Sequence, residues 1–385
     1  MSNPKVHPAI LLSPVENGYV AYDPVRDELH QLNPVAALLT ELCDGSRSVA
    51  EITTLAEPFL PPGESESVAR WVAQATTAGL LTDADGQAAG HGELSAAELA
   101  NLTVRLREWG KVQTAYICGK RAMELDPTNH MAWYNLGEIA HCLGKRDEAR
   151  AAYEKYMEGY PDDGEVEHIL IALRDETPDR ASDRAIQHIY RNFAASYESR
   201  MVDELKYAGP QRMIEAVDSV TGVKEGLTVL DMGCGSGLGG INFRPRAASL
   251  TGIDLSPEMV ELARARNLYD RLEVAEITEW LARDQDQFDL IVSTDCIIYF
   301  GDLTALVAAA ARRLKPGGTF ALSTELGDRA PFRLTDSGRY SHHPDHMRDV
   351  AQKAGLKVGG ISEGFLRTEY GKDVIGLFTV LQKPA

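Results

Sequence analysis

One short stretch, residues 229–237, constrains the fold of this chain more than any other part of it. The stretch reads VLDMGCGSG, so an apolar run that ends in Asp231 leads directly into a turn with three alternating glycines. A second apolar run at residues 250–254 ends in another acid, Asp254. A buried strand, a glycine turn and an acid at this interval are typical of a nucleotide-type cofactor held on a doubly wound α/β sheet, where the acid accepts hydrogen bonds from the ribose.

Two details of this motif argue against a dinucleotide. Asp231 puts an anion where it would repel a pyrophosphate, and Gly233, Gly235 and Gly237 do not have the dinucleotide spacing. The stretch resembles motif I of the class I S-adenosylmethionine (SAM) methyltransferases, whose ligand carries a sulfonium cation and an ammonium group instead of phosphates. This resemblance implies SAM as the cofactor and S-adenosylhomocysteine (SAH) as the product.

The part of the chain from residue 185 to 385 alternates strand and helix patterns, which predicts a mostly parallel sheet. A closing pair of strands around a turn at 370–372 predicts an antiparallel final hairpin. The expected strands are 227–231, 249–253, 272–275, 287–293, 317–323, 356–367 and 373–382. This order resembles the seven-stranded Rossmann-like sheet of class I methyltransferases. The phrases that resemble the tetratricopeptide-linked members of that class are residues 207–210, 295–303 and 337–342.

The first module, residues 1–84, is expected to be a small winged-helix-like α+β domain. Three short strands are predicted around residues 10–12, 18–22 and 28–32, and three helices follow them. Asn33 and Ser48 are typical N-caps for the first two of these helices. The order of elements, with YDP at 22–24 and LNP at 32–34, resembles the PqqD-like domains, which bind the leader segment of ribosomally made peptides.

Residues 93–175 are expected to be entirely helical. The positions of Trp133, Gly137 and Tyr153 match the register of a 34-residue tetratricopeptide repeat, and small or apolar residues recur one period upstream. Two repeats are evident, with a degenerate third near residues 165–174. Two repeats alone rarely bury enough surface to stand independently, so this module is expected to pack on a neighbour.

Composition excludes several classes of function. The 385 residues carry a net charge of −18, which argues against a broad nucleic-acid surface and against binding to anionic membranes. The five cysteines are scattered and form no CxxC pair, which indicates reduced thiols and no zinc site. The N-terminus lacks a signal-peptide pattern, and no apolar run approaches the length of a membrane span. We therefore expect a cytoplasmic protein without a metal.

The resemblance to methyltransferases assigns roles around the cofactor. Leu255 and Met259 would line the adenine, Glu276 would accept from its amino group, and Tyr190 and Tyr197 would form an aromatic lid near the sulfonium. Asp231 can pair with the amino-acid part of SAM. The full expected set is Tyr190, Tyr197, Asp231, Gly233, Gly235, Gly237, Asp254, Leu255, Met259, Glu276, Ile277 and Asp295.

Methyl transfer is an in-line displacement on a sulfonium, so the protein mainly positions the partners and excludes water. A base is needed only when the acceptor must lose a proton, and the candidates are Asp295, Tyr299 and His342. Arg339 is a candidate clamp for a carboxylate of the substrate. The alternative for His342 is a solvated or capping histidine.

In PqqD-like domains a leader peptide adds as a strand to an open sheet edge beside the third helix. The resemblance therefore implies a leader groove on this module, and the alternative is that Trp71 simply fills the small core. The expected groove residues are Leu29, Leu32, Val68, Trp71 and Val72.

Together these observations predict a SAM-dependent methyltransferase that acts on a ribosomally made precursor peptide, recruited through its leader by the first module. A second interpretation is a methyltransferase for a small molecule, whose first two modules serve to form a homodimer. A third is a SAM-binding sensor without catalysis.

Overall fold

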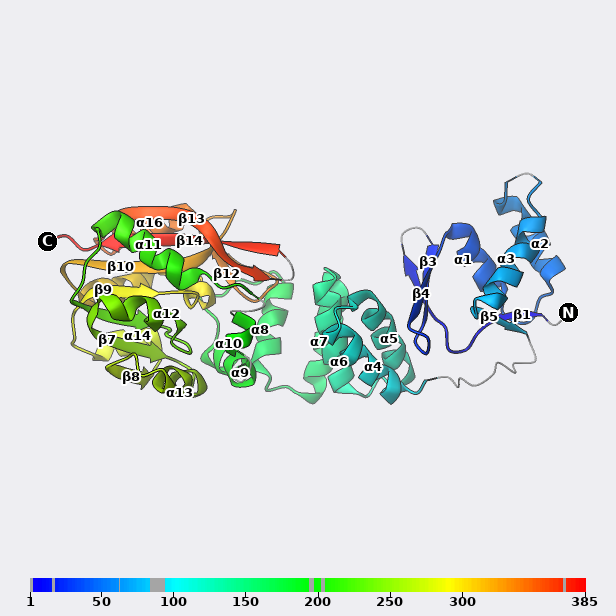
Figure 1. Cartoon of the computed structure of the whole chain (residues 1–385), viewed down its shortest axis with the longest axis horizontal. Helices are drawn as coiled ribbons and strands as arrows, with labels where there is room; N and C mark the ends of the chain where they lie inside the picture. Colours follow the sequence, from blue (N-terminus) through cyan, green and yellow to red (C-terminus); the bar gives the residue numbers. More distant parts are fainter. Residues whose placement is uncertain are drawn as a thin grey trace. The chain divides into compact units, whose positions relative to one another are not determined.

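The computed structural model describes residues 3–15, 18–61, 63–83, 94–193, 197–201, 205–369 and 372–385. The chain divides into two compact units, Met1–Tyr160 and Pro161–Ala385 (Figure 1). The sequence predicts a linker at residues 82–92, of which 84–92 lie outside the described residues, as do the first two residues of the expected turn at 370–372. The division after Tyr160 falls inside the segment 93–175 that the sequence assigns to one helical module.

The second unit contains a doubly wound sheet, and its seven main strands have the order β8-β7-β6-β9-β10-β14-β13. β14 runs antiparallel to both of its neighbours, and the pairs among β6 to β10 are parallel. The strands are β6 (Leu227–Met232), β7 (Ala247–Asp254), β8 (Arg271–Val274), β9 (Phe288–Ser293), β10 (Leu314–Leu326), β13 (Lys357–Glu369) and β14 (Lys372–Gln382). This is the predicted Rossmann-like sheet with its closing antiparallel hairpin.

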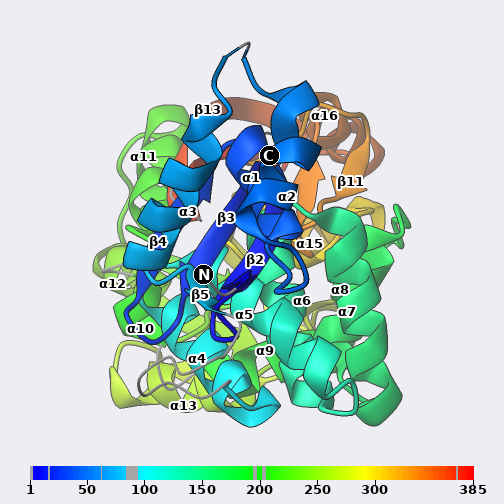
Figure 2. The same ribbon diagram turned by 90° about the vertical axis from the view of Figure 1, so that its right-hand side faces the viewer.

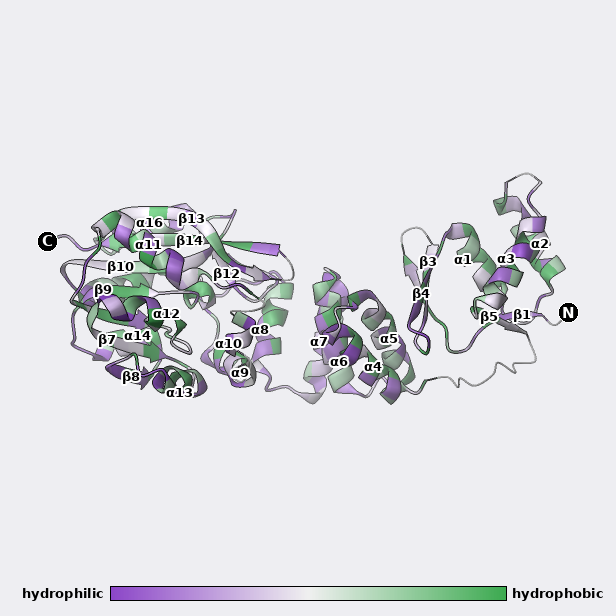
Figure 3. Ribbon diagram, in the orientation of Figure 1, coloured by the Kyte–Doolittle hydropathy of each residue, from purple (hydrophilic) through white to green (hydrophobic). Residues whose placement is uncertain are grey.

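Helices cover both faces of this sheet because neighbouring residues of each strand point to opposite faces. Leu230 of β6 lies in a core with the helices α14 (Ile277–Arg283), α15 (Thr304–Arg313) and α16 (Pro344–Lys353). Its neighbour Val229 lies in a second core with α11 (Gly209–Thr221) and α12 (Leu238–Phe243). Figure 3 shows the hydrophilic colouring at β8 and on α13 (Pro257–Ala265), toward one edge of the sheet.

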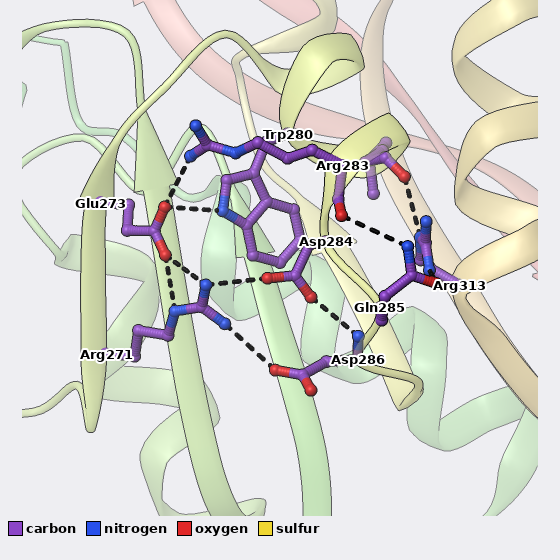
Figure 4. Close-up of polar contacts among 9 residues, drawn as sticks. Arg271, Glu273, Trp280, Arg283, Asp284, Gln285, Asp286 and Arg313 are labelled. Carbon is purple, nitrogen blue, oxygen red and sulfur yellow. Dashed lines mark hydrogen bonds and ion pairs between the residues drawn. The ribbon is translucent and has the colours of Figure 1, made fainter.

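The edge strand β8 carries a network of charged groups (Figure 4). Arg271 pairs with Asp284 at 2.8 Å and lies over the ring of the fully buried Trp280, 5.4 Å from its centroid. Glu273 accepts from the Trp280 indole N–H at 3.1 Å and pairs with Arg283 at 2.7 Å. Charged side chains discourage another strand from pairing with this edge, and the network also fixes α14 against the sheet.

Two segments before the sheet belong to the same unit. α8 (Gly164–Leu173) packs on the short hairpin of β11 (Phe332–Leu334) and β12 (Tyr340–His342), where His168 Nε2 bonds to the Gly338 carbonyl at 2.9 Å. α9 (Asp183–Phe193) and α10 (Tyr197–Ser199) follow α8. The expected degenerate third repeat is therefore one helix that packs on the hairpin of the sheet, because its apolar face meets Leu334 and Tyr340.

The helical part of the first unit contains two antiparallel helix pairs. These are α4 (Ala96–Glu108) with α5 (Val112–Leu125), and α6 (His130–Cys142) with α7 (Arg146–Gly159). Gly137 permits the second pair to approach closely, since a Cβ there would lie 2.7 Å from the Tyr153 ring. The small residue at this repeat position is thus required by packing.

The first module is a small α+β fold, which Figure 2 brings to the front. Its antiparallel sheet has the order β2-β3-β4, and β1 pairs with β5. Asn33 caps the first helix and Ser48 forms a capping box with Glu51 on the second, as expected. The elements are β1 (Pro4–Val6), β2 (Leu11–Val15), β3 (Gly18–Asp23), β4 (Glu28–Leu32), α1 (Pro34–Leu42), α2 (Val49–Ala56), α3 (Glu66–Thr77) and β5 (Leu81–Asp83).

Candidate functional site

A cavity with about 570 Å³ of empty space lies at the carboxyl ends of β6, β7 and β9. This is where ligands bind in open α/β sheets. The lining residues are Arg180, Ile186, Tyr190, Tyr197, Gly233, Gly235, Asp254, Leu255, Glu276, Ile277, Thr294, Asp295, Cys296, Tyr299 and Phe300.

The glycine turn forms the floor of the cavity. The backbone N–H groups of Gly233 and Cys234 both donate to the Ile253 carbonyl, at 2.8 and 3.0 Å. Gly233 has φ +70°, and a Cβ there would lie 2.2 Å from Cys296 Sγ. Gly237, at φ +84°, ends the turn and α12 begins after it. Glycine at 233 is therefore required both by backbone conformation and by the close approach of Cys296.

Gly233→Ala is expected to weaken SAH binding at least about tenfold, because the turn must shift to avoid the Cys296 side chain and a left-handed backbone strains alanine by about 1–2 kcal/mol. Calorimetric titration with SAH measures the effect. Gly317→Ala is the matched control, since Gly317 also has φ +74° but nothing lies within 4 Å of its Cβ position. Equal losses in both variants would contradict the role of the Cys296 contact.

Two acids flank the glycine turn. Asp231 is buried, its Oδ2 accepts from the Tyr269 hydroxyl at 2.7 Å, and its Oδ1 has no hydrogen-bond partner among the described residues. Burial raises the pKa of Asp231 to about 7. Asp254 accepts from the backbone N–H of Gly235 and of Ser256, both at 2.9 Å, so it holds the turn against β7. Asp254 lines the cavity, where a carboxylate fits ribose hydroxyls. Asp231 and Gly237 were also expected at the cofactor, but they are not among the lining residues.

The cavity wall includes Leu255, Glu276 and Ile277, to which the resemblance assigns the adenine. Met259 is fully buried and does not line the cavity, because its position on α13 points it into the core. Glu276 caps α14 by accepting from the Glu279 N–H at 2.8 Å, and it also accepts from Thr278. Its other oxygen meets Arg180 at 3.1 Å. Sequence analysis missed Arg180, which stands in a charged segment that resembles an ordinary linker.

Three tyrosines cover the cavity from α9, α10 and the turn after β9. The ring centroid of Tyr190 lies 6.2 Å from that of Tyr197 and 6.0 Å from that of Tyr299, whose hydroxyl donates to the Tyr190 hydroxyl at 3.2 Å. Burial raises the pKa of all three phenols. They therefore keep their protons near neutral pH, which argues against Tyr299 as a general base.

Asp295 lines the cavity at the end of β9 and is held rigidly. It has φ +53°, its N–H donates to Ser323 Oγ at 2.9 Å, and its Oδ1 meets Arg367 at 2.7 Å. Arg367, almost fully buried, also pairs with Glu325 and lies 3.4 Å from Glu369. The periodicity of a strand gives no signal for Arg367, so this partner could not be found from sequence.

Arg339 does not line the cavity, although it was expected to clamp a substrate carboxylate. It pairs instead with Glu369, and the charges of Arg339 and Arg367 outweigh burial and lower the pKa of that carboxyl. Its guanidinium is therefore already neutralised by a protein carboxylate.

His342 also lies away from the cavity wall. It is fully buried, its Nε2 bonds to the Gly301 carbonyl at 3.0 Å, and its ring stacks on His346 with centroids 5.7 Å apart. The sequence placed it on a polar stretch, but the stretch forms β12 beside β10 and turns this side chain into the core. His342 is thus placed as a packing residue.

Burial lowers the pKa of His342 to about 4, from about 6.5 in an unfolded chain. The unfolded state then binds more protons between these values, so this residue's stabilisation is complete above pH 6.5 and is lost as pH falls toward 4. His342→Gln is expected to reduce the slope of unfolding free energy against pH in this window by up to about 1.4 kcal/mol per pH unit. Urea titrations from pH 4 to 7 measure this slope, and a slope equal to that of the wild type would contradict the prediction. His141→Gln is the control.

The described ranges contain no group of three or more histidine, cysteine, aspartate or glutamate side chains that could hold a metal ion. In the same part of the chain, every helix is too short or too polar to cross a membrane.

Comparison with known proteins agrees with the geometry. Residues 229–318 match the family described as methyltransferase domain. Over 175 residues the chain is 32% identical to the ubiquinone biosynthesis O-methyltransferase of Xanthomonas euvesicatoria pv. vesicatoria (strain 85-10), a match that covers 40% of this chain and 73% of that protein. The chain belongs to the SAM-dependent methyltransferases. SAM is accordingly the cofactor. We propose that Gly233, Gly235 and Asp254, which line the cavity, contact it.

The same O-methyltransferase of Xanthomonas oryzae pv. oryzae (strain PXO99A) is 36% identical over 141 residues, which cover 34% of this methyltransferase and 59% of the relative. The chain thus spans 59% of the length of that relative. Outside the sheet, residues 18–81 match the family of coenzyme PQQ synthesis protein D (PqqD), and residues 118–151 match a tetratricopeptide repeat.

Solved structures of methyltransferases also match. A magnesium protoporphyrin IX methyltransferase from Synechocystis PCC 6803 with bound SAH is 18% identical with a TM-score of 0.40, over 52% of this chain and all of that one (100%). A complex of the Haloferax volcanii Trm112 methyltransferase activator with a putative methyltransferase is 23% identical with a TM-score of 0.40, over 51% of this chain and 98% of that one.

Proposed function

We propose that this methyltransferase transfers the methyl group of SAM to a ribosomally made precursor peptide, which the PqqD-like module recruits through its leader. The observation that carries the proposal is the presence of both modules in one chain. In this arrangement the three modules are 1–84 for the leader, 93–175 for the helical spacer and 185–385 for methyl transfer. Tethering raises the local concentration of a weakly bound core peptide, so one site can act on varied sequences.

The sheet edge of β4 supports recruitment. β4 pairs with β3 alone among the described strands, whereas β2 on the other side contacts α5 of the helical repeat. Leu29 on β4 is half exposed and Trp71 on α3 is partly buried. A peptide that adds as a strand gains backbone hydrogen bonds, and exposed apolar side chains give it register.

Three of the expected groove residues have another role in the structure. Leu32, Val68 and Val72 are buried in the core of the module, so they support the groove from beneath and do not line its surface. The groove proposed now is the β4 edge, with Trp71 on the face that the helices cover. Leu29 lies on the opposite face of the sheet, because it pairs with Tyr22 whereas the core residue Leu32 pairs with Tyr19.

Asp295 is the carboxylate that we assign to the acceptor, because it lies at the cavity wall after β9 and its Oδ2 is not engaged by Arg367. It would accept a proton or a hydrogen bond from the acceptor atom. The tyrosine lid would exclude water and face the sulfonium.

Co-expression of the full chain with a short peptide encoded beside it, followed by intact mass measurement, tests the proposal. A mass gain of one or more methyl groups on the peptide, absent with Asp254→Ala, is the expected result. No gain while SAH still binds would contradict it. A second candidate, methylation of a small molecule, is favoured by the names of the relatives, and turnover of a phenol without any peptide would establish it.

A further inference from the structure

Arg180 lines the cavity, although its segment 179–181, which we call the strap, precedes the sheet and lies outside the matched methyltransferase domain. We propose that Arg180 of the strap is a positioning residue of the cofactor site, which holds Glu276 in place at the adenine end. This inference goes beyond the proposed function, because it concerns cofactor binding and is independent of the acceptor.

Arg180 reaches the cavity wall in a defined geometry. Its Nη1 lies 3.1 Å from Glu276 Oε1, and its Cζ lies 5.1 Å from the centroid of the Phe300 ring. Glu276 and Phe300 both line the cavity. Nε donates to the Ala181 carbonyl at 3.1 Å and Nη2 donates to Asp183, so the guanidinium plane is fixed by four different neighbours. A planar guanidinium suits this combination of stacking and ion pairing better than an ammonium group does.

The strap itself is held by backbone hydrogen bonds to the turn after β9. Ala181 N–H donates to the Tyr299 carbonyl at 2.8 Å, and Gly301 and Asp302 donate to the Asp179 carbonyl at 2.7 and 3.0 Å. Ala181 is fully buried in the core between the sheet and the helices α14, α15 and α16. Arg180 is therefore pre-organised by its own backbone and pays little conformational entropy on ligand binding.

Glu276 needs such a partner because its side chain is only 7% exposed. One oxygen is used by the α14 cap, and the other meets Arg180 as its one protein partner among the described residues. The hydrogen bonds from Thr278 and Glu279 and the charge of Arg180 outweigh burial and lower the Glu276 pKa. An ionised carboxylate only accepts hydrogen bonds, so it suits the adenine amino group and disfavours a carbonyl at that position.

Calorimetry on the full chain tests this role with two probes, SAH and an SAH analogue that carries hypoxanthine in place of adenine. The wild type is expected to prefer SAH by at least about tenfold, the size of one hydrogen bond to a charged group. Arg180→Met is expected to weaken SAH about tenfold and to remove most of this preference, whereas Arg180→Lys restores part of both. In the double variant Arg180→Met with Glu276→Gln, the loss of SAH affinity is expected to be clearly smaller than the sum of the losses in the two single variants.

Arg184→Met is the matched control. Arg184 is half exposed on α9 and pairs with Glu167 on α8, outside the cavity. It should leave both affinities unchanged. The inference is overturned if Arg180→Met, or Arg180→Lys should the first variant not fold, binds both probes like the wild type, or if SAH affinity falls while the preference for adenine stays intact. Because no acceptor is present, a negative result here leaves the proposed peptide substrate unaffected.

Discussion

Asp254→Ala is expected to weaken SAM binding by at least about a hundredfold and to abolish methyl transfer at ordinary cofactor concentrations. We propose that this carboxylate accepts from two ribose hydroxyls, and each hydrogen bond to a charged acceptor contributes about 1.5–3 kcal/mol. The variant also frees the Gly235 and Ser256 N–H groups, which Asp254 holds at 2.9 Å, so the glycine turn loses its anchor to β7. SAH titration by calorimetry measures the loss.

Asp289→Asn is the control for a general effect on the sheet. Asp289 likewise accepts from a backbone N–H, that of Thr228 at 2.9 Å, and pairs with Lys315 at 2.8 Å, but it lies at the opposite ends of the strands from the cavity. It should cost stability without a change in SAH affinity. A similar loss of affinity in both variants would mean that Asp254 acts through the fold and not through the ribose.

Leu29→Asp is expected to raise the KM for a full-length precursor peptide at least about tenfold while kcat stays the same. Burial of a leucine contributes about 1.5–3 kcal/mol, and the new charge would oppose an apolar leader side chain at the β4 edge. Leu29 is 50% exposed, so the substitution leaves the core of the module intact. Turnover of a core peptide without its leader should be unaffected.

Leu55→Asp on α2 supplies a close control, since Leu55 is 49% exposed on another surface of the same module. Leu12→Asp on β2, where the leucine is 37% exposed, tests the other edge of the small sheet. If KM rises equally in the β4 and α2 variants, the effect is one of charge and not of a leader site. If only the β2 variant responds, the leader adds at that edge instead.

Much of the architecture could be predicted from the sequence because it depends on local patterns. The glycine turn and Asp254 occupy the expected ends of β6 and β7. The seven strands occur where the alternation of strand and helix patterns predicted them. The caps at Asn33 and Ser48 also follow from residue type at a helix start. These features depend on residues that lie close together in the sequence, so few competing interactions affect them.

The errors concern side-chain direction. Met259 and His342 lie in the core, and Arg339 pairs with Glu369, although the sequence predicted all three at the cofactor or acceptor site. A helix or strand fixes which residues share a face, but the surrounding layers decide whether that face meets a cavity or a neighbour.

The sequence by itself determined the cofactor class and the order of modules, because its motifs resemble those of known families. A glycine turn after a strand, followed by an acid, also located the cofactor end of the sheet. Only the tertiary structure decided the rest of the wall. Arg180 meets Glu276 across 96 residues, and Arg367 meets Asp295 across 72. Pairs so distant carry no periodic signal, because their geometry exists only after the strap and the closing hairpin have packed against the sheet.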